Sequence, residues 1–149
     1  MKEFFDLLKK FDLKGIFLTP TKNGFLQLFR YLFVGGIATV VDWGVLFGLT
    51  ELFNVHKMVS AVFGFVAGLS TNYLLSKLLV FRANEARTNG MLEFLGYAVI
   101  GLIGLGITEL ILLLGNSFPT VHYMAFKAIA TVVVLAWNYL ARKILLYKK

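Results

Sequence analysis

The sequence contains no cysteine and only two histidines among its 149 residues. The absence of cysteine excludes disulfide bonds and thiolate metal sites, and two histidines leave little from which to build a zinc centre. Charged residues are also scarce, at 15% of the chain. No nucleophile and base pair, metal constellation or glycine-rich phosphate loop stands out, so we predict neither an enzyme nor a bound cofactor, metal ion or nucleic acid.

Hydrophobic residues, in contrast, make up 58% of the chain, which is well above the proportion in a soluble domain. They form four runs, each about as long as the roughly 20 residues that a helix needs to cross a bilayer. Because unpaired backbone groups are not tolerated in lipid, each run is predicted to be helical, which gives an all-α integral membrane protein. The predicted spans are Arg30–Phe53, Met58–Phe81, Met91–Leu114 and Tyr123–Tyr147.

The two halves of the chain resemble each other when the sequence is shifted by sixty-six positions. The shift pairs Asn72 with Asn138 and Lys77 with Lys143, without any gap. It also pairs Tyr73 with Tyr139, Phe81 with Tyr147 and Val55-His56-Lys57-Met58 with Val121-His122-Tyr123-Met124. A match of this length indicates an internal duplication, with repeat one at residues 29–82 and repeat two at residues 95–148.

Lysine and arginine gather on one side of the predicted spans and give the chain a net charge of +7. The chain ends and the segment between the second and third spans hold most of them, whereas the two turns within the hairpins carry only Lys57. By the positive-inside rule, both termini of this multi-pass protein face the cytoplasm. Because each repeat contains two spans, the two repeats are predicted to insert in the same, parallel orientation.

The N-terminal segment 1–14 is amphipathic, with apolar residues at helical spacing and charged residues around the rest of the circumference. The apolar residues are Phe4, Leu7, Leu8 and Phe11. The pattern is typical of a helix that lies in the headgroup layer, although a helix packed on a neighbouring subunit is an alternative. Gly15 and Pro20 are predicted to end this helix. Residues 1–24 therefore read as an interfacial helix and linker, and residues 25–149 as the transmembrane domain.

Three polar residues are predicted near the middle of the bilayer, where they are costly. Asp42 lies about 18 Å along the helix axis from Arg30, which is near the centre of a hydrocarbon core about 30 Å thick. A charge at that depth costs about 2.5 to 3.5 kcal/mol and usually faces a cavity or a partner, so Asp42 is interpreted either as binding a ligand or as a protonated or asparagine-paired structural residue. Asn72 and Asn138 lie at equal depth, and they are interpreted either as hydrogen-bonding each other or as binding a polar ligand.

Cations form the rest of the candidate site. Lys127 stands eleven residues before Asn138, so both project from one side of the fourth span; Lys127 alternatively extends to the outer headgroups. Arg30, Lys77, Arg142 and Lys143 lie at the cytoplasmic ends of the spans. Orientation alone accounts for them, but a basic pocket between spans is also typical of a site for a phosphate-bearing lipid headgroup.

The chain resembles the GtrA-like family of small four-span membrane proteins. The resemblance rests on Phe29-Arg30-Tyr31-Leu32-Phe33-Val34-Gly35-Gly36, on the Asn72-Tyr73 to Lys77 to Phe81 segment, on Glu93-Phe94, and on the Asn138-Tyr139 to Lys143 to Tyr147 segment. It covers residues from about Phe25 to the C-terminus. Lys77 and Lys143 depart from it, since the family more often has arginine there, and a lysine lacks the bidentate fork of arginine.

The resemblance implies that the protein acts on polyprenyl-phosphate-linked sugars in the cytoplasmic (inner) membrane. The expected function is to flip an undecaprenyl-phosphate-linked monosaccharide across that membrane for glycosylation of cell-surface polysaccharide or teichoic acid. The alternative is a membrane anchor or regulator of a polyprenyl-phosphate glycosyltransferase, which is the expected protein partner. Because four helices barely enclose a sugar-phosphate head, either a lateral groove or a homo-oligomer is expected.

Overall fold

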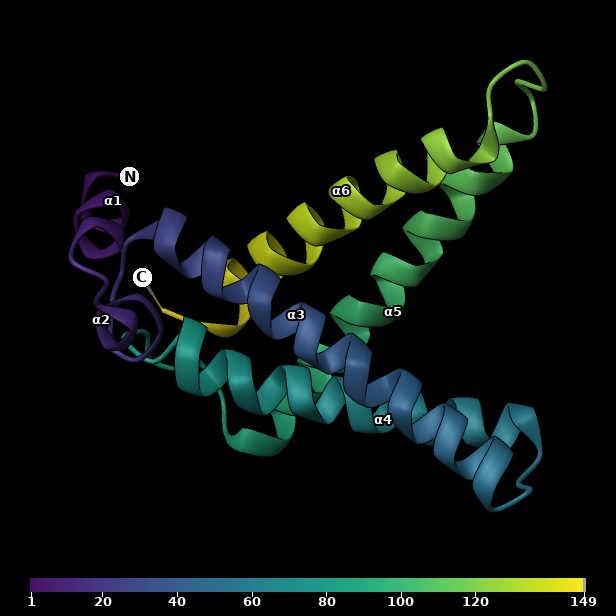
Figure 1. Ribbon diagram of the computed structural model, residues 1–149, viewed down its shortest axis with the longest axis horizontal. Helices are drawn as coiled ribbons and strands as arrows, with labels where there is room; N and C mark the ends of the chain where they lie inside the picture. Colours follow the sequence, from purple (N-terminus) through teal and green to yellow (C-terminus); the bar gives the residue numbers. More distant parts are fainter. Residues whose placement is uncertain (149) are drawn as a thin grey trace. The chain divides into compact units, whose positions relative to one another are not determined.

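The computed structural model describes residues 1–148 and contains four helices that are long and apolar enough to cross a membrane (Figure 1). These spans are Gly24–Leu52, Lys57–Val80, Gly90–Gly115 and Tyr123–Leu146. Within the described residues there is no strand, and the one isolated β-bridge joins Ala86 to Tyr147. The predicted all-α membrane class is therefore confirmed. The chain divides into two compact units, Met1–Asn84 and Glu85 onward, which we describe separately.

The first unit is a helical hairpin with two short helices at one end (Figure 1). Its long elements are α3 (Gly24–Phe47), which continues as the π-helical turn η1 (Gly48–Leu52), and α4 (Lys57–Leu75), which continues as the π-helical turn η2 (Ser76–Val80). The first span begins six residues earlier than predicted, because the Asn23 side chain caps α3 by accepting hydrogen bonds from Phe25 N and Leu26 N. Arg30 consequently lies inside the helix and not at its start.

The N-terminal segment folds into two helices and not the single predicted one. Helix α1 (Lys2–Lys9) ends before Phe11, whose φ of 49° is left-handed, and the Asp12 side chain then caps α2 (Leu13–Phe17). The prediction that Gly15 ends a helix is wrong, because Gly15 is buried within α2. The position of this segment at the membrane interface stays a prediction.

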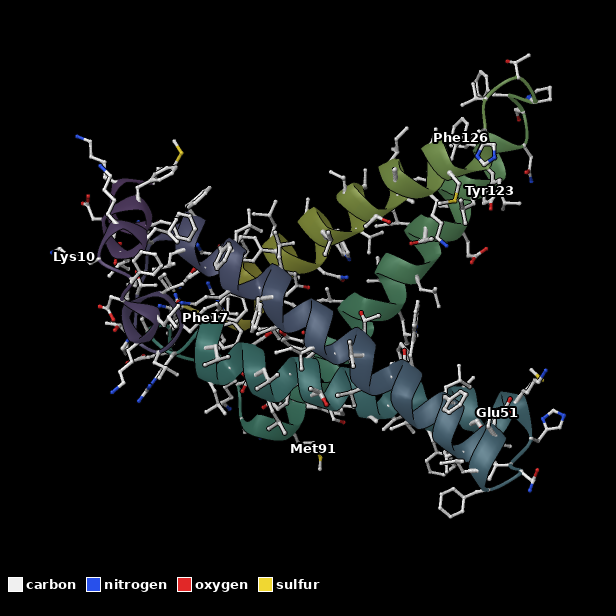
Figure 2. All side chains as sticks on the ribbon, in the orientation of Figure 1. Lys10, Phe17, Glu51, Met91, Tyr123 and Phe126 are labelled. Atoms are coloured by element: carbon white, nitrogen blue, oxygen red, sulfur yellow. The ribbon has the colours of Figure 1, made fainter. Side chains whose placement is uncertain are left out.

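Aromatic rings join the short helices to the first turns of α3. The ring centroid of Phe4 lies 5.3 Å from that of Phe25 and 4.9 Å from that of Phe29. Phe17, labelled in Figure 2, contacts Phe33 at 4.9 Å. The apolar face of α1 therefore packs within its own unit through Phe4, whereas Phe5 and Leu8 stay exposed.

The second unit is also a helical hairpin. It consists of α5 (Gly90–Gly115) and α6 (Tyr123–Ala141), and α6 continues as the π-helical turn η3 (Arg142–Leu146). At the end of this hairpin away from its turn, the chain before α5 pairs with the last residue of η3 and the chain after it. Arg87 N donates to Leu146 O at 2.8 Å, and Lys148 N donates to Glu85 O at 2.7 Å. The outer surfaces of all four long helices carry apolar side chains, as expected for helices in lipid (Figure 2).

Local structure recurs at the interval of sixty-six residues. Asn23 and Asn89 cap the first long helix of each unit, and His56 and His122 cap the second, each through Nδ1. The π-helical turns η2 and η3 also begin sixty-six residues apart. The duplicated sequence thus forms the same local elements twice, while the parallel orientation of the two repeats stays a prediction.

Candidate functional site

Each unit holds a lysine against a tyrosine at the end of its last long helix. Lys77 Nζ lies 3.4 Å from the Tyr73 hydroxyl, and Lys143 Nζ lies 3.2 Å from the Tyr139 hydroxyl. Each ammonium group also lies over the tyrosine ring, at 5.6 and 5.4 Å from the centroid. The spacing of four residues places each pair on one helix face. Both tyrosines are buried, whereas Lys77 is exposed and Lys143 is half-buried.

The asparagines lie one residue before these tyrosines and have different surroundings. The Asn72 Oδ1 atom accepts a hydrogen bond from Ser76 Oγ at 3.2 Å. The Asn138 amide lies against Gly104 of α5, where a Cβ would be only 3.1 Å from Asn138 Oδ1. That Oδ1 atom is buried and accepts no hydrogen bond from the residues that the structure describes. Both asparagines lie eight residues, or about 12 Å, before the end of their span, while their equal depth in the membrane stays a prediction.

Asp42 lies where α3 packs closely against two glycines of α4. A Cβ placed on Gly64 would be 2.6 Å from Asp42 Oδ1 and 2.8 Å from the Asp42 carbonyl oxygen, and one on Gly68 would be 2.9 Å from Asp42 Cβ. The two glycines are thus the small face against which the aspartate packs. Asp42 stands ten residues, or about 15 Å, before Leu52, and its position near the middle of a 30 Å core stays a prediction.

Arg30 is almost wholly buried, with 1% of its surface exposed, and its guanidinium donates to four backbone carbonyls. Nη1 bonds Leu79 O at 2.8 Å, and Nη2 bonds Gly15 O at 3.0 Å and Thr19 O at 2.8 Å, while Nε bonds Ile16 O. Gly15 and Ile16 lie at the end of α2 and Leu79 at the end of η2, where helix carbonyls lack intrahelical donors and attract a cation. In this conformation Arg30 joins three parts of the first unit, which favours a structural role over the predicted contact with a ligand.

Arg142 is the buried arginine of the second unit. Its side chain is 3% exposed, and its Cζ lies 3.7 Å from the centroid of the Tyr97 ring, a stacked cation–π arrangement. Arg142 is sixty-six residues after Ser76, which is buried as well. The adjacent Lys143 is on the same π-helical turn, so this turn presents one cation to the core of its hairpin and one to its partly exposed side.

The structure brings some of the predicted residues together and leaves others apart. Lys127 is exposed on α6, three helical turns from Asn138, so it does not contact the other candidate residues of its unit. Asp42 lies about 18 residues into the first span, whereas Lys77 is in the terminal turn of the second. The predicted convergence of the Asn72 to Lys77 segment with the Asn138 to Lys143 segment stays a prediction.

A buried carboxylate was missed by reasoning from the sequence. Glu93 has no exposed surface and accepts a hydrogen bond from the Tyr147 hydroxyl, which is itself 1% exposed. The shift of sixty-six residues pairs Glu93 with Gln27, which is also wholly buried and donates to Thr21 O and Asn84 Oδ1. The sequence signal for this pair was the presence of a polar residue at the equivalent position of both repeats, each within an apolar span.

Replacing Tyr147 with phenylalanine is expected to destabilise the second unit. The change removes the hydroxyl that donates to the buried Glu93 carboxylate, and a buried acceptor that loses a donor costs about 1 to 3 kcal/mol. Thermal unfolding in detergent micelles measures the effect. The matched control is Tyr123→Phe, because Tyr123 is 67% exposed and its loss should leave the unfolding temperature unchanged. Equal behaviour of the two variants would contradict the importance of this hydrogen bond.

The sequence of this chain matches a known protein family. The family described as "GtrA/DPMS, transmembrane domain" matches residues 30–147. The chain is also similar to an uncharacterized membrane protein, YwcD, of Bacillus subtilis (strain 168), with 26% identity over 121 residues that cover 80% of this chain and 94% of that protein. No solved structure gives a significant match. The resemblance that the sequence motifs indicated is confirmed by the family match.

Proposed function

Since the chain belongs to the GtrA/DPMS transmembrane domain family, which implies involvement in polyprenyl-phosphate sugar translocation, we propose that it is the flippase itself. The proposed substrate is an undecaprenyl-phosphate-linked monosaccharide, made on the cytoplasmic side of the inner membrane by a partner glycosyltransferase. The protein performs no covalent chemistry on it. The sugar-phosphate head moves across the bilayer along the polar residues of the hairpins while the prenyl chain remains in lipid.

The observation that carries this proposal is the duplicated group of asparagine, tyrosine and lysine at the end of each hairpin. Tyr73 with Lys77, and Tyr139 with Lys143, each place an ammonium group and a phenol hydroxyl within 3.4 Å of each other. Together they offer a phosphate one charge and two hydrogen-bond donors. The asparagine about one turn deeper adds an amide that can bind sugar hydroxyl groups. Such polar groups inside a span are costly, which favours a role in moving a polar head over a purely anchoring role.

The proposed function is tested by reconstituting the full-length protein in liposomes that contain a radiolabelled polyprenyl-phosphate hexose. Periodate added outside does not cross the bilayer, so it oxidises only the sugars in the outer leaflet. Protein-free liposomes should leave about half of the label protected. With active protein, the protected half should become reactive over minutes. Protection that persists with folded protein, together with normal recruitment of a glycosyltransferase, would instead support the anchor or regulator.

Removing both lysine charges is expected to slow this transfer. In the variant Lys77→Gln with Lys143→Gln, each phosphate contact loses a charged hydrogen bond worth about 1.5 to 3 kcal/mol, so the rate should fall about tenfold or more. The matched control is Lys148→Gln, an exposed lysine at the same end of the second unit. Substitution of both lysines by arginine keeps the charge and adds a bidentate fork, so it should restore transfer. Full transfer in the double glutamine variant would contradict the role of the two lysines in binding the phosphate.

A further inference from the structure

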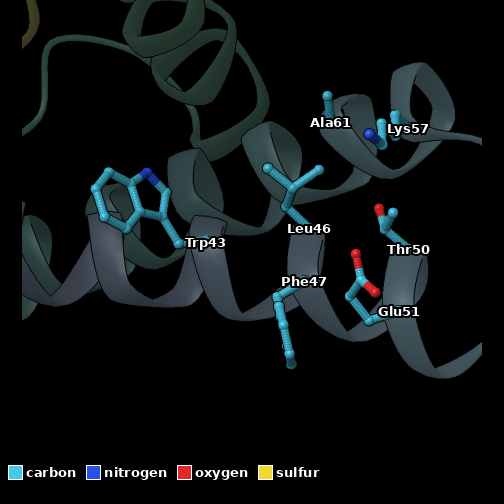
Figure 3. Close-up of a pocket in the computed structure, with 7 residues that line it drawn as sticks. All are labelled: Trp43, Leu46, Phe47, Thr50, Glu51, Lys57 and Ala61. Atoms are coloured by element: carbon cyan, nitrogen blue, oxygen red, sulfur yellow. The ribbon is translucent and has the colours of Figure 1, made fainter.

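A groove with both apolar and polar lining lies at the opposite end of the first hairpin from Lys77. It is an open groove of about 540 Å³ along the end of α3, η1 and the start of α4 (Figure 3). Lys57, which lines it, stands twenty residues before Lys77 on the same span, which corresponds to about 30 Å of helix. The volume falls within the range of about 300 to 1,000 Å³ that small-molecule sites occupy.

The groove changes from apolar to polar along its length. Trp43, Leu46 and Phe47 line the part that is deeper in the span. Thr50, the carboxylate of Glu51 and the ammonium group of Lys57 line the part at the end of the span (Figure 3). A molecule that fits this order has an apolar chain on the bilayer side and a polar head at the membrane surface. Its head must carry an anion for Lys57 and hydrogen-bond donors for Glu51.

The Thr50 hydroxyl distinguishes this groove from ordinary helix packing. Elsewhere in the four spans, Thr39, Thr71, Thr108 and Thr131 each donate to the carbonyl four residues earlier. Thr50 lies in the π-helical turn η1, and its buried Oγ1 makes no hydrogen bond with any residue that the structure describes. A buried hydroxyl without a partner costs about 1 to 3 kcal/mol, and π-helical turns often occur at functional sites. This hydroxyl is therefore a candidate hydrogen-bond group for a molecule bound in the groove.

A smaller pocket of about 290 Å³ lies at the equivalent end of the second hairpin, but the charges of the groove are a feature of the first repeat alone. The shift of sixty-six residues pairs Glu51 with Ser117 and Lys57 with Tyr123, so neither charge recurs in the second copy. The π-helical turn does not recur either, because α5 remains α-helical to Gly115. Charges that were not needed for the duplicated fold are better explained by a ligand that binds one copy.

We propose that this groove binds the lipid-linked sugar after its head has crossed the membrane, with Lys57 at the phosphate, and Glu51 and Thr50 at the sugar hydroxyl groups. The prenyl chain lies along Trp43, Leu46 and Phe47. The assignment rests on the proposed function for its substrate, but it concerns a second site, at the end of the span opposite to Lys77. A sugar is favoured over other polar heads because its hydroxyl groups both donate to a carboxylate and accept from a threonine.

Binding is measured directly in nanodiscs that contain the full-length protein, using a polyprenyl-phosphate hexose as the probe and native mass spectrometry as the readout. Glu51→Gln, Lys57→Gln and Thr50→Val should each weaken binding of the probe, by about tenfold for the charged residues. The matched control is Glu109→Gln, which removes an exposed carboxylate from the corresponding helix of the second unit. Thr50→Val also controls for folding: it removes an unsatisfied hydroxyl without loss of volume, so thermal stability should stay equal or rise while binding falls.

The transfer assay separates this inference from the proposed function. One outcome is that the wild type transfers the lipid and that Glu51→Gln and Lys57→Gln change neither binding nor transfer. That result would contradict the groove as a binding site but would still support the flippase. The other outcome is that the wild type transfers no lipid while the same variants lose binding. That result would support the groove as a binding site and contradict the flippase function. Equal displacement of the probe by phosphatidylethanolamine would show a site for ordinary phospholipid, which contradicts the sugar assignment.

Discussion

Alanine in place of Arg30 is expected to cost about 4 kcal/mol or more of stability, among the largest losses for any single substitution in this chain. Hydrogen bonds to a charged group contribute about 1.5 to 3 kcal/mol each, although they do not add fully, and Arg30 makes four of them. The carbonyls of α2 and η2 would then lie buried without a donor. We expect α1 and α2 to detach from α3, which limited proteolysis of the N-terminal segment and thermal unfolding in detergent will detect.

Two further variants separate the structural role of Arg30 from contact with a phosphate. Lysine at position 30 keeps the charge but not the fork, so it should recover part of the stability. Arg82→Ala is the control, because the exposed Arg82 donates one hydrogen bond, to Leu18 O of the same segment. If the Arg30→Ala protein is folded and stable but has lost lipid transfer, the structural role is contradicted. Contact of Arg30 with the ligand is then supported.

Arg30 also illustrates what the sequence alone does not reveal. Its position at the start of a predicted span is typical of an orientation signal, and this reading needs only local composition. Its hydrogen-bond partners lie 11 to 15 residues before it and 49 residues after it, at separations that follow no helical period. Such contacts depend on how helices pack, so neither hydropathy nor charge counting predicts them.

The spans and the equal distance of the two asparagines from their helix ends were predictable for the opposite reason. Crossing a bilayer requires a continuous apolar run, and this requirement is visible in any window of about 20 residues. The duplication then fixes Asn72 and Asn138 at the same distance from the ends of their helices. The surroundings of the two amides were not predictable, because Ser76 and Gly104 approach them through different elements. Thr50 was not predictable as a site residue either, because no sequence pattern shows that its buried hydroxyl lacks a hydrogen bond.

The second large effect is expected from Gly64→Ala, which tests how closely α3 and α4 approach each other. The added Cβ would meet the Asp42 carbonyl oxygen at 2.8 Å as well as the Asp42 carboxylate at 2.6 Å. A side chain can rotate away, but a backbone carbonyl within a helix moves only if the helices separate. Overpacking of this kind costs about 1 to 3 kcal/mol. Separation of the two helices would also shift Asp42. Thermal unfolding in detergent should therefore show a clear loss of stability.

A matched control and a double variant make the Gly64 test specific. Gly44→Ala changes a glycine on the facing helix whose Cβ would have no heavy atom within 4 Å, so it should be neutral or slightly stabilising because alanine favours helix. Combining Gly64→Ala with Asp42→Ala removes the carboxylate but not the carbonyl, so only part of the lost stability should return. Full recovery in the double variant would mean that the side chain alone governs the contact, and neutrality of Gly64→Ala itself would contradict the close packing of the two helices.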